Sequence, residues 1–340
     1  MNYKYSHCVY IGRFQPFHLG HLYTVEKALQ LSEVVIIFLG SHQVAPNIKN
    51  PWNSEHRQSM ITGCFDAATR DRIIFAYVRD RLYSDNLWVS DIQKQVEMIT
   101  DASDSIAIIG HQKDNSSYYL DLFPQWDYLP IDNYQDLNAT AIRDLYFSGS
   151  DDWQRSSQLP PSIIADLKTF QSDPEYQRLS EEWRFIQQYK KSWSVAPYPP
   201  IHVTVDAVVV QSGHVLMVRR KASPGKGQVA LPGGFINPSE TLEQAMLREL
   251  KEETGIKVPT PVLKGSIVGR QVFDNPDRSQ RGRTITHAFF IQLKSGPLPR
   301  VKGSDDADKA WWMSLSSLEK NEPRFYEDHF HIIQHFISQI

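Results

Sequence analysis

The chain has 340 residues, of which 41% are hydrophobic and 22% charged, and its formal net charge is -3. This length favours two domains, and the apolar content suffices for two cores. The lack of a basic excess argues against a nucleic-acid-binding protein. Two cysteines are too few for a disulfide framework, and the longest apolar runs are only strand-sized. We therefore expect a soluble protein of the cytoplasm, with no membrane partner.

The first 150 residues alternate short β-rich runs with helical patterns. The runs are residues 7–12, 34–40, 72–78, 105–110 and, more weakly, 126–131. Helical spacing of apolar residues occurs from Leu22, from Ser54 and over 86–99. Near-continuous apolar strands separated by helices predict an α/β, Rossmann-like domain with a parallel sheet over 1–150. Such sheets bind ligands at the carboxyl ends of their strands.

The rest of the chain has a different pattern. Residues 161–192 show only helical spacing, and a proline-rich stretch, SVAPYPP (194–200), follows them. From residue 201 onward, Val-rich strands occur at 201–210, 214–220 and 283–293, and a single long helix is expected at 239–254. We therefore predict a helical connector and linker at 151–200, and an α+β domain with a mixed sheet at 201–340.

GRFQPFHLGH (12–21) lies between the first predicted strand and a helix. A glycine turn at such a junction brings backbone N–H groups and the positive end of the helix together, which suits phosphate groups. His18 and His21 can face the same point and donate hydrogen bonds to charge that develops on transferred oxygens. A zinc site would need more ligands, and two surface histidines would not need Gly12 and Arg13 beside them. We therefore favour a phosphate site.

This stretch resembles the H-x-G-H signature of the nucleotidylyltransferase superfamily, in the form of its archaeal-type NMN adenylyltransferases. LNATAIR (137–143) is similar to the second motif of that family, ISSTxIR, with Asn138 and Ala139 in place of serines. The resemblance implies in-line attack of the NMN phosphate on the α-phosphorus of ATP, with Mg²⁺ brought by ATP. It implies catalysis by His18, His21, Arg13 and Arg143. It implies ATP binding by these four residues and by Gly12, Phe14, Gly110 and Thr140.

Two further segments resemble the part of this family that binds NMN. NPWNSEHR (50–57) is similar to its NP…ER segment, and SDNLWVS (84–90) to the segment whose tryptophan stacks on nicotinamide. The resemblance implies that NMN contacts Arg57, Asn86 and Trp88. An electron-poor pyridinium ring prefers an aromatic face, but burial in the core is an alternative for Trp88. A different phosphate acceptor, such as a phosphopantetheine or a sugar phosphate, is a further alternative.

The predicted helix of the second domain carries an apolar stripe that turns acidic midway. The stripe begins with Leu242, Ala245 and Met246, and its extension reaches Glu249, Glu252 and Glu253. Carboxylates at this spacing repel one another unless a cation lies among them, and hard oxygen ligands favour Mg²⁺ or Mn²⁺. The alternative, a solvated charged face, would require polar neighbours on the stripe, and these are absent.

Residues 234–256 are similar to the Nudix box, G-x5-E-x7-R-E-U-x-E-E-x-G-U, at every fixed position. The resemblance implies hydrolysis of a nucleoside diphosphate derivative, with catalysis by Glu249, Glu252 and Glu253. The metal ligands that we infer are Gly233, Glu240, Glu249, Glu252 and Glu253. Arg248 would neutralise and orient a glutamate. Asp305 and Asp306 are candidates for the general base, or form a solvated turn, and Arg281 and Arg283 either touch phosphate or flank a strand.

The whole chain resembles bifunctional NMN adenylyltransferase/Nudix hydrolase proteins. That resemblance implies NAD synthesis from NMN and ATP in the first domain, and hydrolysis of ADP-ribose to AMP and ribose 5-phosphate in the second. In the alternative, the Nudix domain is catalytically silent and senses ADP-ribose or NAD. The expected partners are the small molecules ATP, NMN and ADP-ribose, and a homo-oligomer is left open.

Overall fold

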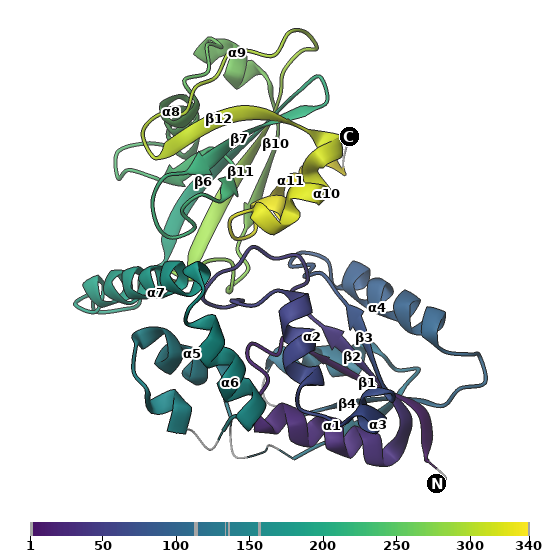
Figure 1. Cartoon of the computed structure of the whole chain (residues 1–340). Coiled ribbons are helices and arrows are strands. Elements are labelled where there is room, and N and C mark those ends of the chain that lie inside the picture. The colour runs from purple at the N-terminus through teal and green to yellow at the C-terminus, as the bar shows by residue number, and fades with distance from the viewer. Residues whose placement is uncertain (1–2, 112–114, 133, 135–136, 156–157, 339–340) are drawn as a thin grey trace. The chain divides into compact units, whose positions relative to one another are not determined.

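The computed structural model describes residues 3–111, 115–132, 134, 137–155 and 158–338, apart from the side chains of 115–117 (Figure 1). Contacts between Cα atoms divide the chain into two compact units, Met1–Glu181 and Glu182–Ile340. The division falls within helix α7 (Pro174–Ser192), inside the segment expected to be a connector. The domain boundaries near 150 and 200 therefore stay predictions.

The first unit contains a fully parallel sheet in the strand order β3-β2-β1-β4-β5, which confirms the predicted α/β fold. The strands are β1 (Tyr5–Gly12), β2 (Ser32–Leu39), β3 (Ile73–Tyr77), β4 (Ile106–Gly110) and β5 (Asp127–Pro130). The chain proceeds from β1 toward one edge and, after β3, from β4 toward the other. The loops that follow β1 and β4 therefore lie at the point where parallel sheets bind ligands.

Helices connect these strands and complete the unit. They are α1 (Leu19–Leu31), α2 (Ser54–Thr62), α3 (Ala67–Arg70), α4 (Asp85–Ile99), η1 (Asn115–Leu122), α5 (Ala139–Ser148), η2 (Asp152–Arg155) and α6 (Pro161–Phe170), followed by α7. Ile92 and Val96 of α4 are buried against Val9, Ile36 and Ile108 of the sheet. Apolar strand residues are buried in this way because helices cover the sheet.

The second unit contains a seven-stranded mixed sheet, as expected. Its main path is β10-β11-β6-β7-β12, while β8 pairs with β7 and β9 with β6. Only β11 and β6 are parallel among the described pairs. The strands are β6 (His202–Gln211), β7 (His214–Arg220), β8 (Val229–Ala230), β9 (Gly233–Phe235), β10 (Ile267–Phe273), β11 (Thr284–Gln292) and β12 (Ala307–Ser314).

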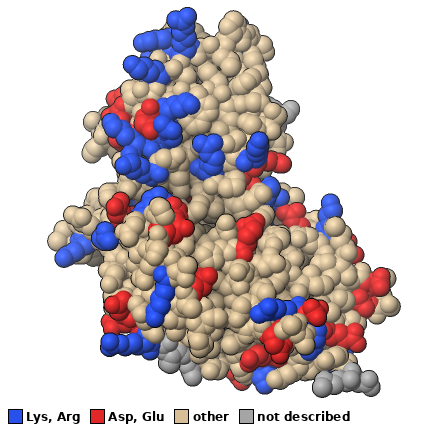
Figure 2. Space-filling model, in the orientation of Figure 1, with Lys and Arg blue, Asp and Glu red and all other residues tan. Residues whose placement is uncertain are grey.

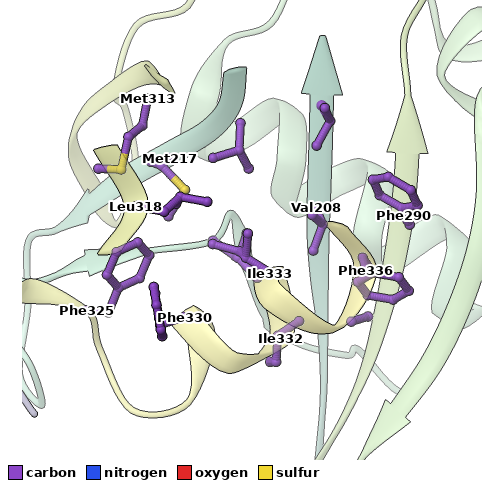
Figure 3. Close-up of a cluster of buried hydrophobic side chains, with 14 of the residues drawn as sticks. Val208, Met217, Phe290, Met313, Leu318, Phe325, Phe330, Ile332, Ile333 and Phe336 are labelled. Carbon is purple, nitrogen blue, oxygen red and sulfur yellow. The ribbon is translucent and has the colours of Figure 1, made fainter. Parts of the chain in front are cut away.

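Two helices bury opposite faces of this sheet. Leu250 of α8 (Leu242–Thr254) packs with Val209 on one face, and Phe336 of α11 (His329–Ile337) packs with Val208 and Phe290 on the other (Figure 3). Val208 and Val209 lie in different cores because successive strand residues point to opposite sides. The long helix expected at 239–254 is α8, and the unit also contains shorter helices: α9 (Thr260–Gly265), η3 (Leu315–Ser317), α10 (Leu318–Asn321), η4 (Glu322–Arg324) and α11.

None of the described helices combines the length and the apolar character needed to cross a bilayer.

Charge is divided unequally between the units. Met1–Glu181 carries 15 Lys and Arg against 23 Asp and Glu, whereas Glu182–Ile340 carries 21 against 16. Figure 2 shows many Lys and Arg side chains on the visible face of the second unit. A phosphate site in the first unit therefore depends on cations placed locally, since the unit as a whole is acidic.

Replacement of Phe330 by alanine tests the core under α11. Phe330 is 2% exposed and its ring centroid lies 5.5 Å from that of Phe325. We expect the free energy of unfolding of the second unit to fall by about 3–5 kcal/mol. In the matched control, Val262→Ala at a position that is 50% exposed, the change should stay within about 0.5 kcal/mol. Urea unfolding measures both, and equal small losses would contradict the packing of α11.

Candidate active sites

A cavity of about 320 Å³ lies at the carboxyl edge of the first sheet. The loop after β1, the end of β4 and the start of α5 all contribute to its wall. The residues expected to bind ATP all line it: Gly12, Arg13, Phe14, His18, His21, Gly110, Thr140 and Arg143. The fold thus brings residues 12–21 and 137–143 to one cavity, although they are far apart in the sequence.

His18 and His21 form a stacked pair with ring centroids 3.6 Å apart. Nδ1 of His18 accepts the N–H of His21 at 3.4 Å, and Nδ1 of His21 accepts the N–H of His18 at 3.3 Å, so the two residues cap α1 reciprocally. Since Nδ1 accepts, we assign the proton of each neutral ring to Nε2. Burial, and to a lesser extent His18, hold the pKa of His21 well below its usual value. His21 is therefore a neutral donor at pH 7.

The turn that presents this pair depends on Gly12 and Phe14. Phe14 has a φ of 51°, and a Cβ at Gly12 would lie only 2.7 Å from the Phe14 ring. The Phe14 ring in turn meets His21 edge-on, with centroids 4.9 Å apart. A side chain at position 12 would displace Phe14 and, with it, the support of His21.

Two arginines add positive charge to the cavity. Arg13 is exposed, whereas Arg143 is buried and donates to Gln15 O at 2.5 Å, Ile48 O at 3.0 Å and Thr140 Oγ1 at 3.1 Å. Burial lowers the pKa of Arg143 to about 10, so the side chain remains charged at neutral pH. Because a guanidinium has five N–H groups, these three bonds leave two for a ligand.

The start of α5 also faces this cavity. Asn138 caps the helix, since its Oδ1 accepts the N–H of Thr140 at 2.9 Å. Asparagine and serine cap helices about equally well, so this departure from the family motif preserves the helix start. The N-termini of α1 and α5, both lined by cavity residues, favour a bound anion.

The three residues expected to bind NMN do not line the cavity. Arg57 is fully buried, and its guanidinium donates to the carbonyls of Arg13 at 2.6 Å, Gly40 at 2.7 Å and Ser41 at 3.4 Å. Burial lowers the pKa of Arg57 to about 10. In this structure Arg57 supports the loops after β1 and β2, and its expected contact with phosphate stays a prediction.

Trp88 packs partly buried at the edge of the core, its ring centroid 5.9 Å from Tyr119 and 6.0 Å from Phe123. This placement matches the core alternative, and stacking on nicotinamide stays a prediction.

Asn86 is exposed in the first turn of α4. Residues 112–114 of GHQKD lie outside the described residues. Sequence reasoning missed Tyr10 and Tyr119, which line the cavity but belong to no motif.

A second cavity, of about 430 Å³, lies in the second unit. Several residues expected at a metal-dependent site line it: Gly233, Arg248, Glu249, Glu253, Arg281, Asp305 and Asp306. Glu240, Glu252 and Arg283 are not among its lining residues. The Nudix-like segment therefore contributes to a cavity, but only part of its acidic set faces that cavity.

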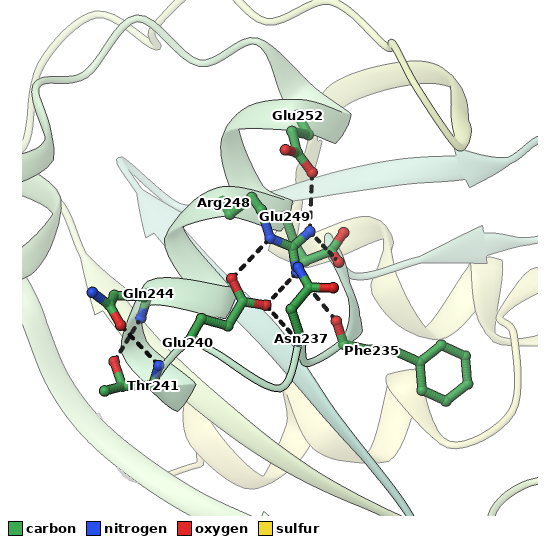
Figure 4. A network of polar contacts seen from close by, with 8 residues as sticks. All are labelled: Phe235, Asn237, Glu240, Thr241, Gln244, Arg248, Glu249 and Glu252. Atoms are coloured by element: carbon green, nitrogen blue, oxygen red, sulfur yellow. Dashed lines mark hydrogen bonds and ion pairs between the residues drawn. The ribbon is translucent and has the colours of Figure 1, made fainter.

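Arg248 lies at the centre of a polar network (Figure 4). Its guanidinium binds both oxygens of Glu240 at 2.6 and 3.0 Å, Oε1 of Glu249 at 2.7 Å, Oε2 of Glu252 at 3.0 Å and Phe235 O at 3.2 Å. These bonds tie the loop that precedes α8 to the helix itself. Glu240 is therefore the bidentate partner of Arg248 in this structure, and its expected role as a metal ligand stays a prediction.

Gly233 and Gly234 let the preceding loop approach α8 closely. A Cβ at Gly234 would lie 2.6 Å from Glu249 Oε1, and the N–H of Gly233 donates to Glu253 Oε2 at 3.0 Å. Burial raises the pKa of Glu253 to about 8 and also raises the pKa of Glu249. Two half-buried or buried carboxylates beside a main-chain loop offer the hard oxygen donors that a divalent cation prefers.

As arranged here, no three His, Cys, Asp or Glu side chains among the described residues are placed to hold one metal ion. Arg248 binds Glu249 and Glu252, whereas Glu253 turns to Gly233. The donor set fits a cation by its chemistry, but Glu249 would have to share or exchange its bond with Arg248.

Sequence reasoning missed another part of this wall, formed by Asp206, Arg220, Arg278, Tyr326 and His329. Arg278 forms a buried bidentate ion pair with Asp328, at 2.8 and 2.9 Å. His329 Nδ1 accepts the N–H of Leu231 at 2.9 Å. These wall residues lie outside both motifs, and only Tyr326 and His329 come from the end of the chain.

A phosphate-binding cavity on a parallel sheet and an acidic helix beside a mixed sheet define two nucleotide-processing domains in one chain. Residues 9–144 match the cytidylyltransferase-like family, and residues 200–336 match the NUDIX domain. A nicotinamide/nicotinic acid mononucleotide adenylyltransferase of Acinetobacter baylyi is 42% identical over 183 residues, which are 54% of this chain and 95% of that relative. The chain therefore belongs to the cytidylyltransferase-like family through its first unit and to the NUDIX family through its second.

Two further relatives bear on the second unit and on the whole chain. An ADP-ribose pyrophosphatase of Methanocaldococcus jannaschii is 38% identical over 135 residues, or 40% of this chain and 72% of that relative. A crystal structure of a bifunctional NMN adenylyltransferase/ADP-ribose pyrophosphatase from Francisella tularensis, complexed with AMP and a manganese ion, is 40% identical with a TM-score of 0.92. The match covers 98% of this chain and 99% of the Francisella tularensis chain.

Arg57→Met tests the supporting role of Arg57. We expect the free energy of unfolding of the first unit to fall by roughly 2–5 kcal/mol, because buried carbonyls lose a charged donor. Lys94→Met, at an exposed position, is the control and should change stability by less than about 0.5 kcal/mol. Thermal and urea unfolding measure both. If Arg57→Met leaves the stability unchanged but raises the KM for a nucleotide, the supporting role is wrong and Arg57 contacts phosphate.

The raised pKa of Glu253 predicts pH-dependent metal binding. Without metal, protonated Glu253 stabilises the fold. This stability is lost as the pH rises from the pKa that Glu253 has in the unfolded chain toward about 8, its pKa in the folded protein. Because a metal requires the carboxylate, the affinity for Mn²⁺ should rise roughly tenfold per pH unit up to about pH 8. Calorimetric titration measures this slope and the released proton. Glu253→Gln should flatten the slope and Glu252→Gln should keep it, whereas a pH-independent wild-type affinity would contradict the assignment.

Proposed function

We propose that this chain is a bifunctional enzyme of NAD metabolism. The first unit transfers AMP from ATP to NMN, giving NAD and pyrophosphate, and the second hydrolyses ADP-ribose to AMP and ribose 5-phosphate. The observation that carries the proposal is the presence of two separate cavities, each formed around one of the two motifs. The likeness of the whole chain to a bifunctional protein of the same two activities supports it.

In adenylyl transfer, an oxygen of the NMN phosphate attacks the α-phosphorus of ATP, and the bond to the departing pyrophosphate breaks. No covalent nucleophile is required, so positioning and charge neutralisation supply the rate. His18 and His21 donate from Nε2 to phosphate oxygens, and Arg13 and Arg143 neutralise their charge. A neutral His21 suits this task, since it donates without having to lose or gain a proton.

In hydrolysis, a water oxygen attacks a phosphorus of the diphosphate, and the bridging P–O bond breaks to release AMP and ribose 5-phosphate. The proton of the water passes to a carboxylate, and the candidates that line the cavity are Glu249, Glu253, Asp305 and Asp306. Arg248 keeps Glu249 in place beside Gly234.

Glu249, Glu253 and the carbonyl of Gly233 are the groups that would hold a divalent cation, and Glu252 could join after a rotation away from Arg248. A bound Mg²⁺ or Mn²⁺ supplies activation of water and neutralisation of phosphate charge.

In the first unit, we propose that Mg²⁺ enters with ATP. The free thiols of Cys8 and Cys64 support our proposal of a reducing, cytoplasmic location.

A pair of single substitutions tests whether the two activities belong to separate sites. His21→Ala should lower kcat for NAD formation about 100-fold or more, since a donor to the transferring phosphate is lost, and should leave ADP-ribose hydrolysis unchanged. Glu249→Gln should do the reverse. Chromatographic identification of products, from ATP with NMN and from ADP-ribose alone, each with Mg²⁺, measures both reactions.

The same assays separate the alternatives. If wild-type protein binds ADP-ribose but leaves it intact, the second unit is a sensor. If no NAD forms but another phosphate acceptor is adenylylated, the assignment of NMN is wrong. Loss of both activities in each single variant would contradict two independent sites.

A further inference from the structure

Two buried donor groups in the second cavity have no hydrogen-bond partner among the described residues. They are the hydroxyl of Tyr326, whose side chain is 4% exposed, and Nε of Arg281. Both residues line the cavity. Buried polar groups in proteins are nearly always satisfied, so donors left open in a cavity call for an acceptor supplied by a ligand.

A second guanidinium lies beside the same tyrosine. Arg220, at the end of β7, stacks over the Tyr326 ring with its guanidinium carbon 4.1 Å from the centroid, and its Nε donates to Pro224 O at 2.9 Å. Arg281 stacks in a similar way over Phe235, at 4.9 Å. A stacked guanidinium presents its N–H groups edgewise, in the geometry that binds phosphate oxygens. Neither arginine forms an ion pair within the described residues.

The loop between β7 and β8 holds this arrangement in place. The N–H of Gly225 donates to Glu182 Oε2 at 3.0 Å, and the N–H of Gly227 donates to Arg220 O at 2.9 Å. Gly225 has a φ of 73°, and a Cβ there would lie 2.3 Å from the Tyr326 ring. The loop is therefore closed tightly over Tyr326, so that Arg220 and Tyr326 are positioned before a ligand arrives.

The cavity is also lined by Asp206, Glu249, Glu253, Asp305 and Asp306, so its positive groups are set against carboxylates elsewhere on the wall. Arg278 is neutralised by Asp328, and Glu327 is the one further carboxylate from this segment of the chain that lines the cavity. Against it stand Arg220 and Arg281, and burial keeps the Tyr326 hydroxyl protonated by raising its pKa. The groups present thus favour an anion with several oxygens.

We propose that Arg220, Arg281 and Tyr326 bind the diphosphate of the substrate, while the glutamates of α8 provide for the cation. The inference rests on the proposed hydrolysis and extends it, because it names the groups that recognise the diphosphate itself. It also assigns different roles to the members of two arginine pairs, Arg219 and Arg220, and Arg281 and Arg283, which the sequence alone does not distinguish. Arg219 binds Asp308 and Arg283 donates to Asp274 O, and neither lines the cavity.

The adjacent arginines provide matched controls for the test. Arg220→Ala and Arg281→Ala are compared with Arg219→Ala and Arg283→Ala, which remove the same charge outside the cavity. Tyr326→Phe removes only the hydroxyl and keeps the ring under Arg220, so the fold is retained. Calorimetry measures the binding of inorganic pyrophosphate to the full chain in EDTA. The first cavity is identical in all variants and contributes a constant background.

Each arginine variant should weaken pyrophosphate binding in the second cavity, and kcat/KM for ADP-ribose, by about 10- to 100-fold, the range for a lost charged hydrogen bond. Tyr326→Phe should lose about 3- to 10-fold, and the controls less than 2-fold. Thermal unfolding verifies that the variants are folded.

The outcomes distinguish this inference from the proposed function. If wild-type protein cleaves ADP-ribose and the cavity variants behave like their controls, the diphosphate subsite is overturned and the hydrolase stands. If wild-type protein does not cleave ADP-ribose but the cavity variants alone lose pyrophosphate, the subsite stands and its substrate must be another diphosphate. If the two arginine variants lose binding but Tyr326→Phe does not, the subsite consists of Arg220 and Arg281, and the Tyr326 hydroxyl is not part of it.

Discussion

The guanidinium of Arg57 lies fully buried among main-chain carbonyls of the loops after β1 and β2, and the first site depends on that interaction. Loops can be buried only if their polar groups find partners, and a planar group with five donors can satisfy several carbonyls at once. Arg143 does the same for Gln15 and Ile48, and in the second unit Arg248 joins Phe235 O to three glutamates. Two buried arginines therefore hold the shape of the first cavity, and the half-buried Arg248 does so for the second.

The two cavities solve the problem of binding polyanions in different ways. The first lies in an acidic unit and combines neutral donors from His18 and His21 with two helix N-termini and two arginines. The second contains buried carboxylates that would repel a diphosphate without a cation, together with stacked arginines that would attract it. A bound cation would offset these carboxylates, so cation and diphosphate are expected to strengthen each other's binding.

Motifs whose function is local were well predicted from the sequence. His18 and His21 were expected to face the same point, and they stack with ring centroids 3.6 Å apart because they lie within one helical turn. Packing partners that lie far away in the sequence could not be predicted. Arg57 donates to the carbonyl of Arg13, Trp88 packs with Tyr119, and Glu240 is held by Arg248. The expected contacts of these three residues with ligands stay predictions, because the sequence does not show which neighbours the fold gives them.

The sequence by itself determined the alternation of strands and helices in the first unit, the parallel and mixed sheets and the two motif-bearing segments, because periodicity and local turn chemistry act over a few residues. Only the tertiary structure decided which arginine of each pair enters the second cavity, since Arg219 and Arg220 are adjacent in the chain and differ by the side of the strand. It also decided that Tyr326, in a segment with no motif, lies under Arg220. Such partners meet through sheet pairing and loop closure, which bring together residues whose sequence separation carries no signal.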